Sequence, residues 1–291
     1  MRSRWRKRVG SEEGQHIVRA WSQGGVLLES YRYAPGHAAE TPRHSHGDYQ
    51  LCFSPNFPGE YRYRGESHAV PVGSLSVIHP GEIHSAHDPQ DREIPAEYRM
   101  LYARPSVFQR VVTEIAGHEG GLPSFPVPVV LDEHLARSFA GMHTALEGSA
   151  SALEKDSRLL SVLSEFVVRW ASERLSPHRI GNEPRAVALA REYLEDDPAG
   201  NVSLEELSRI AHLSSYHLCR VFKKEVGIPP HAYQINVRLD RAKDLLLGGW
   251  TISEVAYRTG FYDQSHFTHS FKRLVGVTPG NYAKNSKIFQ D

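Results

Sequence analysis

The chain has little cysteine and lacks a long apolar run. It has 291 residues, and its two cysteines, Cys52 and Cys219, lie far apart. Two distant cysteines cannot form the disulfide framework of a small secreted protein, which favours a reducing compartment. A membrane-spanning helix needs about 18 consecutive apolar residues, and the sequence contains no such run. We therefore expect a cytoplasmic protein without membrane contact.

The chain also lacks a net charge, with 34 basic and 34 acidic residues. Its charge is unevenly distributed, however, because Arg209 to Lys287 holds twelve basic and five acidic residues. A local basic excess is typical of a nucleic-acid-binding surface. The basic stretch 1–16 has no hydrophobic core of a secretory signal behind it. We interpret it as a frayed tail, with phosphate contacts as the alternative.

The stretch 252–282 has the pattern of two short helices joined by a tight turn. Apolar residues recur at helical spacing on both sides of Gly260, which predicts a helix-turn-helix. The second helix keeps hydrogen-bonding and basic side chains on one exposed face, as a major groove requires. These side chains are Gln264, Ser265, Thr268, His269, Lys272 and Arg273.

A similar pattern occurs about fifty residues upstream, at 203–226, which indicates a tandem repeat. Ser203 with Glu206 predicts a capping box, and Ser214 is expected to cap the second helix of this copy. The exposed face of that helix carries Tyr216, Cys219, Arg220, Lys223 and Lys224. A single copy could be an ordinary helical hairpin with a solvated polar face, but the second copy favours DNA binding.

A connecting helix is predicted between the two copies, from His231 to Gly249. Roughly 17 residues at 1.5 Å each make a rod of about 25 Å. Such a rod can hold two recognition helices about one DNA turn, roughly 34 Å, apart. The repeat and the connecting helix thus support the same interpretation.

Residues 201–282 resemble the DNA-binding domain of AraC/XylS-family transcription regulators. The second copy matches the family pattern at many positions: Ile252, Glu254, Ala256, Gly260, Phe261, Asp263, Ser265, Phe267, Phe271, Lys272, Arg273, Gly276, Thr278, Pro279 and Tyr282. The resemblance implies that Tyr216, Cys219 and Arg220 of the first recognition helix approach base edges. It implies the same of Gln264, Ser265 and His269 in the second. We expect double-stranded DNA and RNA polymerase as partners.

Three positions depart from the family pattern. His212 stands where the first turn usually has glycine, and histidine is among the residues that tolerate positive φ. His269 replaces a usual arginine on the DNA face, which affects the base preference of the second copy. Ala283 replaces the usual arginine after Tyr282 and removes a helix-end or phosphate contact.

The region from Ile17 to Arg104 consists of short alternating runs broken by glycine and proline. This texture predicts an antiparallel β structure that forms a small barrel or jelly roll. Candidate strands are 26–28, 49–53, 61–63, 69–70, 75–78 and 98–102. Segments 43–50 and 71–84 resemble the two cupin motifs, in the form found in effector-binding domains of the same regulator family.

The interior of such a barrel is a natural small-molecule site. Candidate lining residues are Arg43, His44, His46, Tyr49, Tyr61, Tyr63 and His84. They suit a small polar effector, for instance one with a carboxylate. Strand alternation places Tyr61 and Tyr63 on one face and Arg62 and Arg64 on the other, so only one pair can line the interior. Each tyrosine can also serve packing alone.

His44, His46 and His84 are also candidate metal ligands. A His-x-His pair on a strand points both imidazoles to one face, and a third histidine completes a triad. Enzymatic metal cupins usually have a glutamate four or five residues after the pair, where this chain has Gln50 or Leu51. We therefore expect no cofactor and no catalysis, with a divalent metal as the alternative.

Helical periodicity follows Pro105, at 106–118, 132–147 and 151–175. The last of these has a four-three apolar seam at Leu160, Leu163, Val167 and Trp170. This seam predicts a homodimer contact, and packing within the chain is the alternative. Segment 176–184, with two prolines and a glycine, is interpreted as a linker before a lead helix at 185–194.

The predicted fold is mixed: an N-terminal β-barrel or jelly-roll cupin, then helices, then an all-α domain with two helix-turn-helix units. The predicted domains are a basic tail (1–16), a cupin effector-binding domain (17–104), a helical dimerisation region (105–175), a linker (176–184) and a DNA-binding domain (185–291). The predicted function is a sequence-specific transcription regulator, an activator rather than a repressor, that senses a small molecule. The alternatives are a metal-dependent cupin enzyme with a helical partner-binding tail, and a DNA-binding regulator without an effector.

Overall fold

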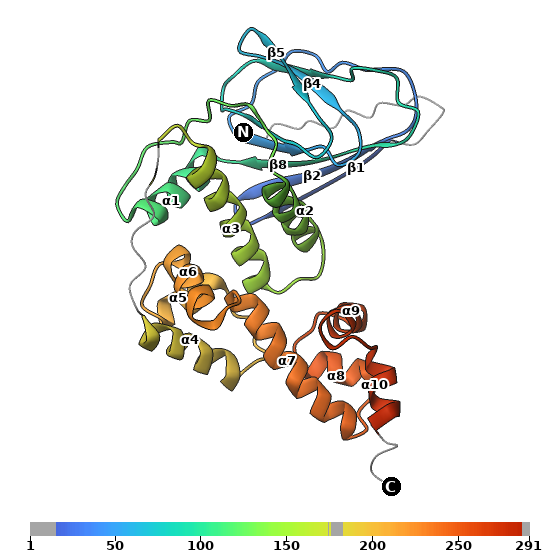
Figure 1. Cartoon of the computed structure of the whole chain (residues 1–291), viewed down its shortest axis with the longest axis vertical. Coiled ribbons are helices and arrows are strands. Elements are labelled where there is room, and N and C mark those ends of the chain that lie inside the picture. The colour runs from blue at the N-terminus through green and yellow to red at the C-terminus, as the bar shows by residue number, and fades with distance from the viewer. Residues whose placement is uncertain (1–15, 174, 176–182, 287–291) are drawn as a thin grey trace. The chain divides into compact units, whose positions relative to one another are not determined.

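The computed structural model describes residues 16–173, 175 and 183–286 (Figure 1). Almost all of the predicted tail and linker lies outside these residues. The chain divides into two compact units. The sheet unit comprises the chain up to residue 105 together with 125–136, and the helical unit comprises 106–124 and everything from 137 onward. Most of the predicted helical region, apart from residues 105 and 125–136, therefore belongs to the same unit as the predicted DNA-binding domain.

The sheet unit contains two antiparallel sheets, which confirms the predicted β architecture. One sheet has the strand order β1-β2-β8-β3-β6-β9, and the other has the order β5-β4-β7. The candidate strands were confirmed, whereas β1, β7 and β9 were missed. The strands are β1 (Ile17–Gln23), β2 (Val26–Tyr33), β3 (Tyr49–Phe53), β4 (Gly59–Tyr63), β5 (Glu66–Val70), β6 (Leu75–Ile78), β7 (His84–His87), β8 (Ala96–Ala103) and β9 (Val129–Val130).

Alternation along β4 determines which side chains lie between the two sheets. Tyr61 and Tyr63 are buried, and Arg62 between them is exposed. The tyrosines therefore belong to the interior, which settles the alternative left open by the sequence. They pack in one apolar cluster with Ile78 of β6, so residues of both sheets share this core.

Three helices follow or interrupt the sheets: α1 (Pro105–Ala116), α2 (Glu133–Glu147) and α3 (Ala152–Trp170). Ser151 caps α3 because its hydroxyl accepts from Glu154 N at 3.2 Å. On α3, Leu163 and Val167 are 1% and 0% exposed within the single chain. Much of the predicted dimer seam is thus filled by the chain itself, in line with the intramolecular alternative.

The remaining helices form two helix-turn-helix motifs joined by one helix. The first motif is α5 (Leu204–Ile210) and α6 (Ser215–Val226), and the second is α8 (Ile252–Arg258) and α9 (Gln264–Val275). The connecting helix α7 (Pro230–Leu247) has 18 residues, which at 1.5 Å each span about 27 Å. Helices α4 (Pro184–Asp196) and α10 (Pro279–Ser286) complete the unit. Each motif has its own apolar core.

The turns of the two motifs use different residues for the same backbone conformation. His212 in the first motif has φ 55°, and Gly260 in the second has φ 78°. The positive φ predicted at His212 is therefore confirmed. A Cβ at Gly260 would lie 2.6 Å from backbone atoms of Ala199, so this turn also requires glycine because of close packing.

Most predicted helix caps are present. Ser203 caps α5 by accepting from Glu206 N at 3.1 Å, and Ser214 caps α6 by accepting from His217 N at 3.2 Å. The capping box predicted at Ser203 is wrong, however, since the Glu206 carboxylate accepts from the Tyr193 hydroxyl at 2.9 Å instead. A complete box occurs in the second motif, between Thr251 and Glu254.

A buried arginine on α7 connects the segment before the first motif to the second motif. Arg238 is 2% exposed and donates to the carbonyls of Pro198 at 2.6 Å and Gly200 at 3.0 Å. Its guanidinium carbon lies 5.9 Å from the centre of the Phe261 ring. Burial lowers the pKa of Arg238 to about 10. Among the described residues, no helix is long and apolar enough to cross a membrane.

Candidate nucleic-acid interface and small-molecule site

The second recognition helix, α9, presents an open polar face. The Asp263 carboxylate caps it by accepting from His266 N at 2.7 Å, and Phe267 and Phe271 are fully buried beneath it. The helix therefore has a fixed start and a fixed inner side. All six side chains predicted to meet DNA lie off that inner side: Gln264, Ser265, His269, Lys272 and Arg273 are exposed, and Thr268 is half-buried.

The first recognition helix, α6, is built in the same way but is less open. Leu218 and Phe222 form its buried side. Lys223 and Lys224 are exposed, whereas the three predicted base readers Tyr216, Cys219 and Arg220 are half-buried. The Arg220 guanidinium lies 5.3 Å from the centre of the Tyr216 ring. Two of these three residues are also in contact with the preceding helices.

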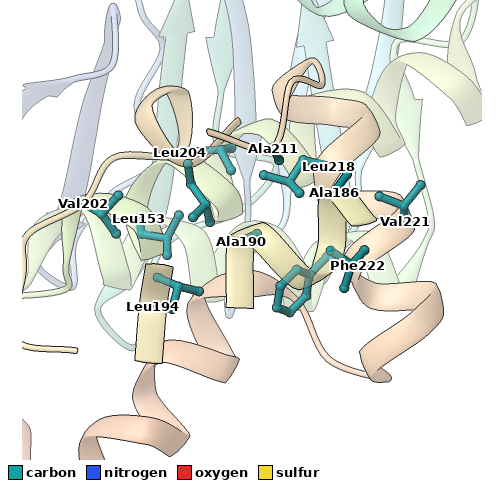
Figure 2. Packing of buried hydrophobic residues seen from close by; sticks show 12 residues of the cluster. Leu153, Ala186, Ala190, Leu194, Val202, Leu204, Ala211, Leu218, Val221 and Phe222 are labelled. Atoms are coloured by element: carbon teal, nitrogen blue, oxygen red, sulfur yellow. The ribbon is translucent and has the colours of Figure 1, made fainter. Parts of the chain in front are cut away.

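Helices α1 and α3 cover part of α6, a feature that the sequence analysis missed. Glu114 on α1 accepts from Tyr216 N at 2.8 Å. Cys219 lies beside Ser157 on α3, and burial raises the pKa of its thiol to about 12. Leu153 of α3 lies inside the core of the first motif, as Figure 2 shows. No local pattern signals these contacts, which join residues far apart in the chain.

In the sheet unit, the three predicted histidines converge. The His84 ring centre lies 4.3 Å from that of His44 and 5.0 Å from that of His46. His44 and His46 were expected on a strand, but they lie in the segment before β3. There His44 forms an isolated β-bridge with His84. Pro42 and Gly47 flank the two histidines, and both residue types disfavour a continuous β-ladder of backbone hydrogen bonds.

Each of these imidazoles uses its Nδ1 to donate to a backbone carbonyl, at 2.8 to 3.0 Å. His84 is buried, and its Nε2 has no hydrogen-bond partner. Burial lowers the pKa of His84 to about 4. His84 is therefore neutral at pH 7, with a lone pair on Nε2 available to a ligand's donor.

Gln50 bears on the alternative of a metal site at these histidines. Oε1 of the Gln50 side chain lies 3.0 Å from Nε2 of His46. This nitrogen, which could otherwise bind a metal ion, is therefore already in contact with a side chain. Across the part of the chain that the structure describes, no group of three or more His, Cys, Asp or Glu residues could hold a metal ion.

Tyr49 and Tyr63 belong to a separate packed group around His79. Phe125 N donates to His79 Nε2 at 2.9 Å, so His79 Nδ1 carries the proton and donates to the Tyr63 hydroxyl at 2.8 Å. The Tyr49 ring lies 5.6 Å from that of His79. Burial lowers the pKa of His79 to about 4. These two tyrosines pack the core, and Arg43 is exposed.

A group of half-buried tyrosines on the inner face of the larger sheet was missed. Strand register pairs Tyr31 with Tyr98, and the Tyr33 ring lies 6.0 Å from that of Tyr98. Tyr102 continues the group toward the histidines, 5.4 Å from His46 between ring centres. Period-two alternation along β2 and β8 is a sequence signal that could have identified them. Tyr61 of β4, a predicted lining residue, is buried opposite this group and accepts from the Gln50 amide at 3.4 Å.

The inner face offers hydroxyl groups and carboxylates. Burial raises the pKa of Tyr33 to about 12 and that of Tyr31 far above its usual value. The hydroxyls thus stay protonated, and Tyr31 donates to the Glu29 carboxylate. Arg92 is buried and ion-paired with Asp88, and it also donates to the Ala34 carbonyl at 3.1 Å. The guanidinium of Arg92 is therefore already paired with protein groups.

Two family models match the chain and together span most of it. An AraC-like ligand binding domain matches residues 27–163, and a helix-turn-helix domain matches residues 207–285. The first match contains nearly all of β2, then β3 to β9, α1, α2 and most of α3, and the second contains both recognition helices. The matches thus agree with the positions of the two candidate sites.

Similar proteins carry related names. YbfI of Bacillus subtilis (strain 168), an uncharacterized HTH-type transcriptional regulator, is 32% identical over 239 residues, covering 82% of this chain and 85% of YbfI. The HTH-type transcriptional activator RhaS of Klebsiella pneumoniae (strain 342) is 25% identical over 247 residues, covering 82% and 86%. The solved C-terminal domain of AraT, a response regulator from Geobacillus stearothermophilus, is 29% identical with a TM-score of 0.34, covering 37% of this chain and 88% of that domain. The chain belongs to the AraC family of transcriptional regulators, with an AraC-like ligand-binding domain and a helix-turn-helix DNA-binding domain.

Proposed function

We propose that this protein activates transcription from a DNA site with two half-sites, one read by α6 and the other by α9. The observation that carries this proposal is the pair of motifs of the same construction on either side of α7. A rod of about 27 Å suits recognition helices placed one DNA turn apart. Activation, which implies contact with RNA polymerase, is supported by the name of RhaS as an activator.

The inner face of the larger sheet is our candidate effector site. Its half-buried tyrosine hydroxyls and the free Nε2 of His84 can exchange hydrogen bonds with a small ligand. Arg43 is exposed and Arg92 is paired with Asp88, so neither guanidinium favours a buried carboxylate. A neutral or cationic effector with several hydroxyl or amine groups suits this face better than the carboxylate first expected.

We further propose that the protein works without a metal cofactor and without catalysis. Gln50, a neutral amide, stands at the position expected of a metal-binding glutamate and contacts His46. Metal analysis of the purified chain and of a His84→Gln variant tests this. Stoichiometric metal that is lost in the variant would favour the enzyme alternative.

The proposal also places the protein in the cytoplasm and makes it a homodimer on DNA. The dimer is limited to the bound state because Leu163 and Val167, in the centre of the predicted seam, are buried within the single chain. Sedimentation of the chain with and without DNA measures this. A stable dimer without DNA would contradict this restriction.

Fluorescence anisotropy with the DNA upstream of the protein's own gene tests the main proposal. Binding should weaken as salt rises, survive competitor DNA, and shift with one of a panel of polyhydroxyl or amine metabolites. An Arg273→Ala variant should bind less tightly and show a smaller salt slope. Binding that competitor DNA abolishes completely would exclude sequence-specific regulation.

A further inference from the structure

We propose that α1 and α3 act as a clamp on the first motif and must release it before α6 can enter DNA. The clamp is defined by Glu114, Leu153, Asp156 and Ser157. This inference rests on the proposed function, because it describes how DNA binding through one of the two motifs is regulated. In the clamped state, the second motif alone presents an open recognition helix.

The first contact places a carboxylate at the start of the recognition helix. Tyr216 is the second residue of α6, and its N–H donates to Glu114 Oε2 at 2.8 Å. The first N–H groups of a helix have no partner within the helix and attract anions. Recognition helices present their N-terminal residues to base edges. Glu114 therefore occupies space, and supplies negative charge, where the negatively charged duplex has to come close.

The second contact repeats this arrangement on the other helix of the motif. Asp156 Oδ2 accepts from Leu204 N, the first residue of α5, at 3.4 Å. In addition, Asn201 Oδ1 accepts from Ala152 N at 3.3 Å. Both helices of the first motif thus begin against a carboxylate from the preceding region. The contacts hold the motif as a whole rather than a single side chain.

Apolar contacts cover the same face. Leu153 is 0% exposed in the core of the first motif, and Leu160 packs against that core. Figure 2 shows Leu153 among Leu194, Val202 and Leu204. Cys219, expected at a base edge, instead lies beside Ser157 of α3 and is half-buried. The face of α6 that is suited to a major groove is therefore partly occupied by α3.

The two carboxylates are held at an energetic cost, which makes the clamp reversible. Burial raises the pKa of Glu114 and that of Asp156, and the backbone N–H groups that they accept from offset this only in part. When the clamp opens, both groups regain solvation. A duplex that supplies phosphates to the same motif can therefore compete with them.

The first motif adds the carboxylates of Asp156 and Glu114 to its own caps Ser203 and Ser214, whereas the second motif has a complete capping box of its own. Thr251 and Glu254 form a box at the start of α8, and Asp263 caps α9. Its helix starts are therefore satisfied whether or not α1 and α3 are in place. The asymmetry predicts that the free protein binds DNA through α9 first and recruits α6 only when the clamp opens.

The test measures binding of the full chain to a short duplex of arbitrary sequence, so no operator has to be known. Glu114→Gln should bind about fivefold tighter, with a salt slope steeper by about 2, because Lys223 and Lys224 then reach phosphates. The matched control is Glu165→Gln on α3, which removes a carboxylate ion-paired with Arg169 at 3.0 Å. The control should bind as the unmodified chain does.

The possible failures are distinguishable. If the unmodified chain binds DNA and Glu114→Gln does not differ from the control, the clamp is wrong while the proposed function stands. If none of the three proteins binds DNA, the proposed function fails and the clamp fails with it. Melting followed by circular dichroism verifies that each variant is folded.

A disulfide that can be formed and reduced provides a second test. Adding Ser157→Cys to Glu114→Gln places a second thiol beside Cys219, so mild oxidation should join α3 to α6. The oxidised protein should lose the gain in affinity, and dithiothreitol should restore it. Failure to cross-link, or equal affinity of the two redox forms, would overturn the proposal.

Discussion

The two helix-turn-helix motifs share a pattern but differ in their surroundings. Both recognition helices start at a side-chain cap and end at a glycine with positive φ, Gly227 at 86° and Gly276 at 90°. The first motif shares its core with Leu153 of α3, whereas the core of the second comes from α7 to α10 and the turn residue Phe261. Two motifs with the same local sequence pattern can therefore differ in how accessible their recognition helices are to DNA.

The contrast is not complete, because α3 also approaches the second motif near the C-terminal end of α9. A cavity of about 240 Å³ is lined there by residues that include Arg158, His231 and Arg273. The polar face that begins at Gln264 remains exposed. The difference between the motifs thus concerns the recognition face, not every contact.

Replacing Gly260 should have the largest effect, because the turn of the second motif packs against the segment before the first motif. Gly260→Ala places a Cβ 2.6 Å from the Ala199 backbone at a φ of 78°, which should cost about 4 kcal/mol. Gly276→Ala is the control, since its φ is 90° but its surroundings are open, and it should cost about 1 kcal/mol. Urea denaturation of both variants measures the difference. Equal losses would show that close packing at Gly260 is unimportant.

Removing the leucine that α3 inserts should affect the first motif most. Leu153 is fully buried, so Leu153→Ala should lower the free energy of unfolding by about 3 kcal/mol. Hydrogen exchange followed by mass spectrometry should show lost protection in α5 and α6 rather than in α8 and α9. The control, Leu274→Ala, alters a residue that is 50% exposed and should change little. Uniform loss of protection would contradict separate cores.

Base-reading residues should differ in strength between the motifs. Gln264→Ala on the open face of α9 should cost about 1 to 3 kcal/mol of binding to the specific site. Arg220→Ala on α6 should cost less in the unmodified chain than in the Glu114→Gln background. A double-mutant cycle from anisotropy titrations measures this coupling. Additive effects would indicate that α6 reads DNA regardless of Glu114.

Acid should weaken the helical unit through His231. Burial lowers the pKa of His231 to about 4, from a usual value of 6.5. Its contribution to stability is therefore complete above pH 6.5 and is lost as the pH falls toward 4, because the unfolded chain takes up the proton first. We expect a loss of about 1 to 2 kcal/mol. His231→Asn should flatten the dependence in urea melts at several pH values, and His118→Gln, on an exposed histidine, should not.

The smallest effect concerns the turn of the first motif. His212 has φ 55°, where glycine is less strained, so His212→Gly should stabilise the protein by about 0.5 kcal/mol. His212→Ala, which lacks the polar side chain, should be less stable than His212→Gly by about 1 kcal/mol. Thermal melts of the unmodified chain and the two variants rank the three proteins by melting temperature. An alanine variant as stable as glycine would show that the turn is not constrained.

Features with a local cause were predictable from the sequence. Periodicity located the helices and most strands, Ser203 and Ser214 were recognised as caps, and the burial of Tyr61 with Tyr63 follows from alternation along one strand. The convergence of His44, His46 and His84 was also expected, although the pair lies outside a strand. In each case the deciding residues are close in sequence or belong to a known motif.

Features that depend on distant contacts could not be predicted. The bond from Tyr216 to Glu114 spans 102 residues, and nothing near either residue indicates it. His79 has an ordinary sequence context, yet its partner Phe125 lies 46 residues away. The inner tyrosines of β2 and β8 are intermediate, because alternation indicates a shared face but not which face lies inside.

Arg238 has a geometric consequence for the operator. Arg238 donates to the carbonyls of Pro198 and Gly200 while lying over Phe261, and we expect these contacts to restrict rotation of one recognition helix relative to the other. One extra base pair between half-sites turns the second half-site by about 34° around the duplex axis. A regulator joined by a flexible tether would follow that rotation. For this protein we expect affinity to depend on the number of base pairs between the half-sites as well as on their sequence.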